Sequence, residues 1–307
     1  MNEIYQKTLS SPICFEGIGL HSGKISKVKI LPGKENQGIV FRRIDLKDNN
    51  LVLANYKNVS SAKLCTTLQN KHGVKVTTVE HLLAALYIIG IDNALIDIDC
   101  EEIPIMDGSA KDFLNKLNKT IIKTLNKKRK YIKILEKFDF LEGEKKISIE
   151  PNSSFEVDFQ LDYKNKIIGK QKNIVNFLHD DLENVSNSRT FCLYEDIEKI
   201  KKIGLAKGGS LDNAIVVASD KVMNDGGLRN EKEFVNHKIL DLVGDFVLSG
   251  YRVLGKVNCY QGGHELTNKF LRKLLVSNNK LKFLEIDDIL ISKKISSNQP
   301  IKIAASA

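Results

Sequence analysis

The chain has 307 residues, 42% of them hydrophobic and 28% charged, and its formal net charge is +9. This length predicts one large domain or two domains of ordinary size, of which we favour two, and the balanced composition argues against large-scale disorder. The lysines accompany isoleucines and asparagines throughout the chain, so the positive charge indicates a compositional bias and not a focused nucleic-acid surface.

The cysteines and the apolar segments indicate the compartment. Five cysteines are scattered along the chain without any C-x-x-C pair, which argues against a disulfide framework and a thiolate zinc site. Residues 1–17 lack the basic start and apolar stretch of a secretory signal. The longest wholly apolar run, 82–89, is far shorter than the ~20 residues that a membrane span requires. We therefore expect a cytoplasmic protein that does not span a membrane.

The first predicted elements are short strands followed by a very apolar helix. Alternating segments such as 27–31 and 38–41 predict strands separated by turns. Thr77, with Glu80 three residues later, has the spacing of a capping box, and the helix that it opens should end at Gly90. This helix is apolar on nearly every face, so we expect it to lie in the interior.

A strand and a second helix complete the first half. Residues 93–99 alternate as a strand, and Ser109 opens a helix that continues through Leu117. The dense basic run 126–130 follows, and we interpret it as a solvated linker. The sequence thus predicts a first α+β domain over residues 1–126.

The same plan recurs beyond the basic run. Strands are predicted at 131–135, 146–150 and 155–161, followed by helices at about 234–248 and 266–275. This recurrence predicts an α+β fold of two similar domains, each a β-sheet layered with two helices, which pack helix to helix. We place the second domain at 131–280 and a C-terminal tail at 281–307.

One segment of the second half has no counterpart in the first. Between about 188 and 217 the sequence predicts an extra helix at 194–203 and a strand at 214–218. We interpret this segment as an insertion of strand–helix–strand type.

Three polar residues interrupt the aliphatic helix of the second half. His237, Asp241 and Asp245 are spaced four residues apart, so they line one stripe of the helix. Burying two carboxylates and an imidazole without partners would cost several kcal/mol per ionised group. A divalent metal ion would compensate, because His237 and Asp241 can bind one ion from a single helix face. The spacing alone also allows a buried hydrogen bond between the histidine and an aspartate.

The apolar helix of the first half carries a second candidate pair, Glu80 and His81. Glu80 also fits the carboxylate of a capping box, and His81 also fits a core histidine bonded to the backbone. Because both halves carry polar groups on their most apolar helices, we expect a shared active site between the domains. His264 follows two glycines, which let the backbone approach a ligand, so it could protonate a leaving group or be an ordinary surface residue.

Seven short stretches carry a family resemblance. They lie at 17–23, 78–86, 103–110, 188–191, 204–210, 237–241 and 263–264. In content and order they resemble the UDP-3-O-acyl-N-acetylglucosamine deacetylases, zinc enzymes of bacterial lipid A synthesis. The resemblance covers nearly the whole chain up to about residue 275. It implies hydrolysis of the N-acetyl group of UDP-3-O-(hydroxyacyl)-N-acetylglucosamine, which yields the free amine and acetate.

For the metal centre, the resemblance implies that His81, His237 and Asp241 bind Zn²⁺ and leave room for water and the amide oxygen of the substrate. Such an ion makes water easier to deprotonate and polarises the acetamide carbonyl. Glu80, next to one of the ligands, would then be the general base.

The resemblance assigns four further residues to proton transfer and charge stabilisation. His264 would be the general acid or an electrostatic stabiliser, and Asp245 would orient it and hold its charge. Thr190 would donate a hydrogen bond to the tetrahedral oxyanion. Lys238 would offset the charge of the diphosphate or of the oxyanion.

The resemblance also implies contacts to both ends of the substrate. Lys145 and Tyr163 match positions near the nucleotide, although Tyr163 stands where the family often has phenylalanine and Gln261 where it often has a basic residue. The insertion would form an acyl-chain passage, which explains its presence. The implied lining residues are apolar or small: Phe191, Ile197, Ala206, Gly209, Ser210, Ala214 and Val216.

Two alternatives stay open at this point. A basic module for nucleic acid would need clustered lysines and arginines with interleaved aromatics, and the chain shows neither. A metal-dependent deacetylase of another N-acetylated sugar nucleotide would have no use for the insertion. We therefore expect a small-molecule substrate and no nucleic-acid partner. Because the sequence shows no exposed apolar repeat, we also expect a monomeric protein.

Overall fold

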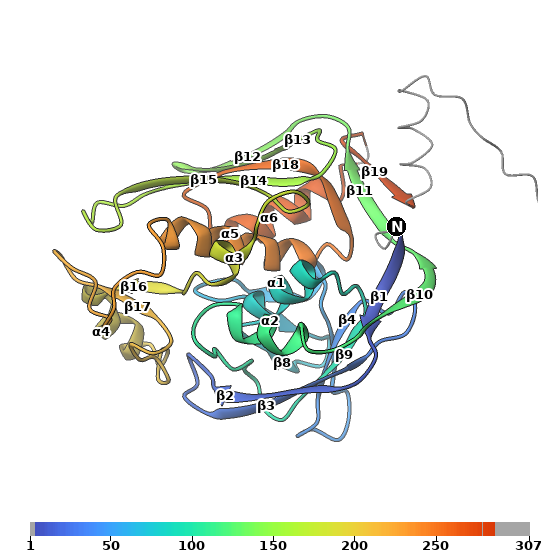
Figure 1. The fold of residues 1–307 in the computed structure, drawn as a ribbon, viewed down its shortest axis with the longest axis horizontal. Coiled ribbons are helices and arrows are strands. Elements are labelled where there is room, and N and C mark those ends of the chain that lie inside the picture. Colours follow the sequence, from blue (N-terminus) through green and yellow to red (C-terminus); the bar gives the residue numbers. More distant parts are fainter. Residues whose placement is uncertain (1–3, 278, 286–307) are drawn as a thin grey trace, which may run out of the picture.

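The structure is a computed structural model that describes residues 4–277 and 279–285. Two main sheets lie on opposite sides of the molecule, with the central helices between them (Figure 1). Most of the predicted tail, from residue 286 onward, lies outside the described residues. Within the described ranges, no helix has the length and apolar character needed to cross a membrane.

The first half is built on a five-stranded sheet. Its strands, in spatial order, are β2 (Ile13–Ile18), β3 (Ile25–Pro32), β9 (Ala94–Ile98), β4 (Ile39–Arg43) and β5 (Leu51–Leu53). Along β3, Val28 and Ile30 are buried whereas Lys27 and Lys29 are exposed, as the period of two in a strand requires. The helices of this half are α1 (Glu80–Ile89) and α2 (Lys111–Leu117), which lie between the two sheets (Figure 1).

Shorter elements complete the first half. A one-turn helix, η1 (Tyr56–Asn58), precedes a three-stranded sheet of β6 (Val59–Ser61), β7 (Thr67–Gln69) and β8 (Lys75–Val76). Strand β1 (Tyr5–Leu9) pairs antiparallel with β10 (Ile122–Lys128), after which the chain enters the second half.

The second half is built on a seven-stranded sheet. Five of its strands are β12 (Phe138–Glu142), β13 (Lys145–Glu150), β18 (Arg252–Tyr260), β14 (Phe155–Asp162) and β15 (Lys170–Asn176), and β11 (Lys130–Ile134) and β19 (Leu281–Glu285) extend it. Three helices lie beneath this sheet: α3 (Glu183–Ser186), α5 (Glu233–Val247) and α6 (His264–Leu274) (Figure 1). The first five residues of the predicted tail therefore form a strand of this sheet.

The two halves repeat one topology. In each half the central strand, β9 or β18, pairs antiparallel with one neighbour, β3 or β13, and parallel with the other, β4 or β14. An edge strand, β5 or β15, follows, and the long helix α1 or α5 precedes the central strand. The prediction of two similar α+β units is therefore confirmed.

Helices α1 and α5 pack against each other in the centre of the molecule (Figure 1). Every residue of α1 from Glu80 to Leu86 is buried, as its apolar pattern predicts. At Gly244 of α5, an added methyl group would lie 2.1 Å from the carbonyl oxygen of Glu80. The glycine is thus what lets the two backbones approach so closely.

The insertion projects from one side of the second half (Figure 1). It consists of β16 (Phe191–Leu193), α4 (Tyr194–Lys202) and β17 (Ile215–Val217). Strands β16 and β17 pair in parallel, with α4 in the connection between them. The predicted extra helix and strand are both present in this segment.

Two local predictions are wrong. The residue before α1 is Val79, which makes no side-chain cap, and Glu80 is the first helical residue, so there is no capping box. The basic run is not a solvated linker, because β10 runs through much of it and Arg129 is only 1% exposed. Its guanidinium is paired with Asp92 at 2.8 Å, a partner that local sequence does not reveal.

Candidate metal centre and active site

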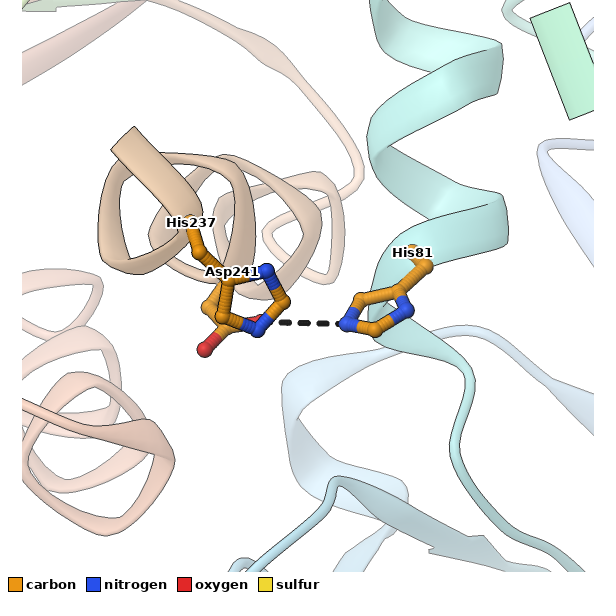
Figure 2. A group of neighbouring side chains, drawn as sticks. All are labelled: His81, His237 and Asp241. Atoms are coloured by element: carbon orange, nitrogen blue, oxygen red, sulfur yellow. Dashed lines mark ion pairs between the residues drawn. The ribbon is translucent and has the colours of Figure 1, made fainter. Parts of the chain in front are cut away.

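Three potential metal ligands meet where α1 and α5 touch. His81 comes from the first turn of α1, and His237 and Asp241 come from successive turns of α5. Figure 2 shows the His81 ring directed toward His237 and Asp241 on the facing helix. The Nε2 atoms of His81 and His237 lie 3.4 and 3.3 Å from Oδ1 of Asp241. Residues far apart in the sequence thus form one compact group.

The chemistry of this trio fits a divalent cation. All three side chains are buried, and Oδ1 of Asp241 and Nδ1 of His81 find no hydrogen-bond partner in the described part of the chain. Burying a carboxylate oxygen without a hydrogen-bond donor destabilises the folded state unless a cation faces the oxygen. Ligand atoms that surround Zn²⁺ tetrahedrally lie about 3.3 Å from one another, because each bond is about 2.0–2.1 Å long. The spacing found here agrees with that value.

The protonation state of His237 also suits a ligand. Burial lowers the pKa of His237 to about 3, so its ring is neutral. Its Nδ1 lies 3.1 Å from the carbonyl oxygen of Ser188, which can accept the ring N–H and leave the Nε2 lone pair facing Asp241. Because metals bind the neutral imidazole, this tautomer prepares the site for a cation.

Glu80 lies beside the trio and is held by a residue that sequence reasoning missed. Burial raises the pKa of Glu80, although His264 and His81 oppose the shift. The backbone N–H of Thr66 donates to Oε2 of Glu80 at 3.0 Å, and the Thr66 hydroxyl donates to Oδ1 of Asp245 at 2.6 Å. Thr66 therefore links the two halves at the site. No motif marks it, because its role depends on a partner 179 positions away.

His264 is buried and is the first residue of α6, so this helix begins two residues earlier than predicted. Its Nδ1 lies 2.8 Å from Oδ2 of Asp245, and its Nε2 lies 3.8 Å from Oε1 of Glu80. Burial alone would lower the pKa of His264, but the carboxylates of Asp245 and Asp241 outweigh it and raise the pKa to about 9. The imidazole is therefore cationic at neutral pH, and the surface-residue interpretation is excluded.

Lys238 brings a positive charge next to the trio. Its ammonium donates to Oδ2 of Asp241 at 2.7 Å. Burial alone would lower the pKa of Lys238, but the facing carboxylate of Asp241 holds the pKa above its usual range. Lys238 also lines a cavity of about 450 Å³, so its charge lies between the trio and that cavity.

The cavity beside Lys238 is polar and contains the residues predicted near the nucleotide. Lys145, Tyr163 and Gln261 all line it. The side-chain amide of Gln261 donates to the carbonyl oxygen of Asp162, so this side chain is bound to the backbone. A lysine pair with an aromatic ring gives the cavity groups that can contact a phosphate and a planar base.

A second cavity, of about 350 Å³, lies against the insertion and is mainly apolar. All seven residues predicted for the acyl passage line it: Phe191, Ile197, Ala206, Gly209, Ser210, Ala214 and Val216. Further lining residues were not predicted: Leu20, Leu64, Cys192, Tyr194, Ile200, Leu211 and Met223. The ring of Phe191 lies 5.9 Å from that of Tyr163 and 6.3 Å from that of His237, so it connects this cavity to the polar one and to the trio.

Thr190 lies in the wall of the apolar cavity, next to Phe191 in the chain. Its backbone N–H donates to the carbonyl oxygen of Gly108, and its own carbonyl accepts from Ile215, both at 2.8 Å. Two residues earlier, Ser188 contacts His237. The backbone thus holds Thr190 between the trio and the cavity.

A glycine-rich loop of the first half supports the insertion. The buried carboxylate of Glu102 accepts from the backbone N–H groups of His21 and Ser22 at 2.8 and 2.7 Å, which fixes this loop. A methyl group on Gly208 would lie 2.3 Å from the carbonyl oxygen of Gly19. The motifs identify both loops, but not Glu102, because its role depends on this tertiary contact.

The chain is similar to known proteins over most of its length. Residues 6–276 match the family model of UDP-3-O-acyl N-acetylglycosamine deacetylase. UDP-3-O-acyl-N-acetylglucosamine deacetylase of Pasteurella multocida is 40% identical over 290 residues, 93% of this chain and 94% of that protein. The protein of the same name in Psychrobacter sp. is 41% identical over 286 residues, 92% of this chain and 96% of that protein. The chain therefore belongs to the UDP-3-O-acyl N-acetylglycosamine deacetylase family.

Proposed function

We propose that this protein hydrolyses the N-acetyl group of UDP-3-O-(hydroxyacyl)-N-acetylglucosamine, as a step of lipid A biosynthesis. The products are UDP-3-O-(hydroxyacyl)-glucosamine and acetate. The observation that carries the proposal is the buried trio of His81, His237 and Asp241, which a polar and an apolar cavity adjoin through Lys238 and Phe191. The names of the family and of its relatives support the same substrate.

We assign Zn²⁺ to the trio. Two imidazoles and one carboxylate are a donor set typical of catalytic zinc, which keeps a further position for water or substrate. When bound, the ion supplies Lewis acidity for the hydrolysis of an amide. Oδ1 of Asp241, which has no hydrogen-bond partner within the described residues, and the tautomer of His237 support this assignment.

Glu80 is the proposed general base. Thr66 fixes one oxygen of its carboxylate, and burial raises its pKa above the ordinary value for a glutamate, which makes the carboxylate a stronger base. Glu80 removes a proton from the attacking water, whose oxygen forms the new bond to the acetyl carbon.

His264 is the proposed general acid. Asp245 accepts the N–H of Nδ1 and stabilises the positive charge of the ring. Nε2 faces the site, 3.8 Å from both Glu80 and Asp241. As the carbon–nitrogen bond breaks, Nε2 donates its proton to the leaving amine, and acetate departs.

Thr190 and Lys238 are the proposed electrostatic contributors. The hydroxyl of Thr190 donates to the oxyanion of the tetrahedral intermediate, an interaction worth about 3 kcal/mol in comparable sites. Lys238, held at Asp241, offsets negative charge on the substrate side of the site.

The two cavities are proposed to hold the two ends of the substrate. The polar cavity, with Lys145 and Tyr163, takes the uridine diphosphate, and the apolar cavity takes the acyl chain. The alternative substrate, another N-acetylated sugar nucleotide, would leave the apolar cavity without an occupant. The acylated sugar is therefore favoured.

Other features of the whole protein also stay proposals. We propose the domain bounds 1–126 and 131–280, with β19 added to the second domain because it pairs with β11, an acyl-passage insertion at about 188–217, and a monomer in the cytoplasm. The five cysteines are all free thiols, which supports a reducing compartment.

A deacetylation assay with acylated and unacylated UDP-N-acetylglucosamine tests the proposal. The purified protein should contain about one zinc per chain, as a three-ligand site implies. It should release acetate from the acylated substrate and act on the unacylated one about a hundredfold more slowly, because remote binding energy contributes to the rate. No acetate from the acylated substrate with zinc-loaded protein would refute the proposal.

Two variants test the metal ligand and the general base separately. His81→Ala should lose both zinc and activity, whereas the matched variant His72→Ala, at an exposed histidine, should keep both. Glu80→Gln should keep the fold and the zinc but lose about a hundredfold or more in kcat. Wild-type turnover in Glu80→Gln would contradict the base assignment.

A further inference from the structure

The end of α1 remote from the trio carries a cluster of charges that the mechanism does not use. We define the Asp92 cluster as Asp92, Arg129, Arg252 and Tyr87. Nε of Arg129 donates to Oδ2 of Asp92 at 2.8 Å, and Nε of Arg252 donates to Oδ1 at 3.2 Å. The backbone N–H of Lys7 also donates to Oδ2, at 2.7 Å. One carboxylate thus receives donors from three separate segments of the chain.

Both arginines also bind the last carbonyl groups of α1. Arg129 donates to the carbonyl oxygen of Gly90, and Arg252 donates to that of Tyr87 at 3.2 Å. The guanidinium of Arg252 lies 4.4 Å from the centre of the Tyr87 ring. Positive groups at a helix C-terminus satisfy its free carbonyls and interact favourably with the helix dipole. The cluster therefore holds the end of α1 in one position.

The cluster joins the two halves of the protein. Tyr87 and Asp92 belong to the first half, Arg252 is the first residue of β18 in the second, and Arg129 lies between β10 and β11. In Figure 1 these last two strands lie on the side of the molecule opposite the insertion. The side chains of Asp92 and Arg252 are each only 16% exposed, so removing one partner would leave a largely buried charge.

The geometry points to Asp92 and Arg252 as positioning residues for the metal centre. α1 carries His81 at its first turn and the Asp92 cluster at its C-terminal end, about 15 Å away along a ten-residue helix. His237 and Asp241 lie on α5, in the other half. By fixing the far end of α1 to β18, the cluster sets the position of His81 relative to the two ligands on α5.

This inference rests on the proposed metal site. Such a site tolerates little error in the positions of its ligands. A misplacement of about 1 Å by a remote mutation can cost a hundredfold in rate. At the near end, Gly244 abuts the backbone of Glu80, and Thr66 bonds Asp245. Between its ends α1 is buried against α5 mainly by apolar packing, which is less directional than hydrogen bonds. The Asp92 cluster supplies the second fixed point.

The test measures the zinc affinity of Arg252→Gln by competition with a chelator, together with its melting temperature and its kcat at saturating zinc. We expect zinc affinity to fall about tenfold, with kcat reduced and the substrate KM nearly unchanged. Added zinc should restore occupancy of the site. The matched control is Arg42→Gln, which breaks a 2.7 Å pair with Asp97 inside the first half and should leave zinc affinity unchanged.

The outcomes separate this inference from the proposed function. If wild-type protein binds no zinc, the proposed function fails. If Arg252→Gln binds zinc as tightly as wild type, the inference is overturned, even when the melting temperature falls. If that variant does not fold, Arg252→Lys replaces it: a lysine keeps the charge but cannot bridge Asp92 and the carbonyl of Tyr87, so an intermediate loss of affinity is expected and wild-type affinity would overturn the inference.

Discussion

Thr66 joins the proposed base to the partner of the proposed acid. Its backbone N–H binds Glu80 and its hydroxyl binds Asp245, which in turn binds His264. One buried threonine therefore orients both proposed proton-transfer groups. Its side chain is not expected to touch the substrate, so its effect on catalysis passes through these two carboxylates.

We predict that Thr66→Val lowers kcat about tenfold or more while zinc is retained. Valine has a similar shape but no hydroxyl, so Oδ1 of Asp245 loses its 2.6 Å donor and the orientation of His264 relaxes. A buried acceptor left without a donor also costs about 1–3 kcal/mol of stability. Steady-state kinetics and thermal unfolding measure both effects. Thr66→Ser keeps the hydroxyl and should recover most of the activity; if it is as impaired as Thr66→Val, the hydrogen bond is not the cause.

At the residue scale, sequence and structure contribute differently to the site. His81, His237 and Asp241 could be predicted from helix spacing together with the family motifs, and the structure brings them together. Thr66 and Glu102 could not be predicted, because each acts through contacts that only the folded chain creates. Their neighbours in the sequence contain no pattern that marks them.

At the scale of elements, the insertion is the segment whose strands and helix line the apolar cavity. Strands β16 and β17 form a parallel pair. The outer face of α4 is polar, and Ile197 and Ile200 of this helix line the cavity. Because parallel strands need a crossover connection, the helix is a topological requirement as well as a wall of the cavity.

We predict that Ala214→Phe selectively impairs turnover of the acylated substrate. Ala214 lines the cavity of about 350 Å³, and a phenyl ring would occupy volume that the acyl chain needs. The value of kcat/KM should fall about tenfold or more for the acylated substrate, because the lost contacts contribute binding energy, and should change little for the unacylated one. Lys202→Phe, on the exposed face of α4, is the matched control. Equal losses with both substrates would argue against an acyl passage.

The helix starts show where element prediction failed. Thr77 and Glu80 have capping-box spacing, yet α1 begins at Glu80 and its carboxylate binds Thr66 instead. Similarly, α6 begins at His264 rather than at Leu266. Start signals are local and weak, so tertiary contacts in the active site override them.

At the scale of the whole molecule, the two halves also meet through an ion pair near the insertion. Nη1 of Arg229 donates to Oδ2 of Asp107 at 2.8 Å and to the carbonyl oxygen of Asn187 at 2.9 Å. Burial alone would raise the pKa of Asp107, but hydrogen bonds from Ser109 and Arg229 outweigh it and hold the pKa below its usual value. The carboxylate therefore stabilises the packing of the halves while it is ionised.

We predict a pH-dependent contribution of Asp107 to stability, of about 1 kcal/mol. The folded pKa is depressed, so the contribution is fully present above the ordinary value of 3.8 and is lost as the pH falls below it through the folded pKa. Urea unfolding of wild type and Asp107→Asn between pH 7 and pH 3 measures the difference. The exposed Asp48→Asn is the control. A difference that stays constant down to pH 3 would contradict the assignment.

The sequence by itself determined the kinds of elements, their order and the repetition of one α+β plan. Alternation predicted strands such as β3, β13 and β14, and the aliphatic pattern predicted α5 to within one residue at each end. These signals are local, because hydrophobic periodicity reflects which side of a strand or helix is buried. The family motifs added the candidate ligands and proton-transfer residues.

Only the tertiary structure decided which of these residues meet. It pairs the strands into two main sheets that repeat one strand order, and it places α1 against α5 at Gly244. It also buries Arg129 in the Asp92 cluster, where the sequence had predicted a solvated linker. Such contacts join positions far apart in the chain, and many partners compete for each one. The choice depends on packing and charge compensation over the whole fold, which no local pattern encodes.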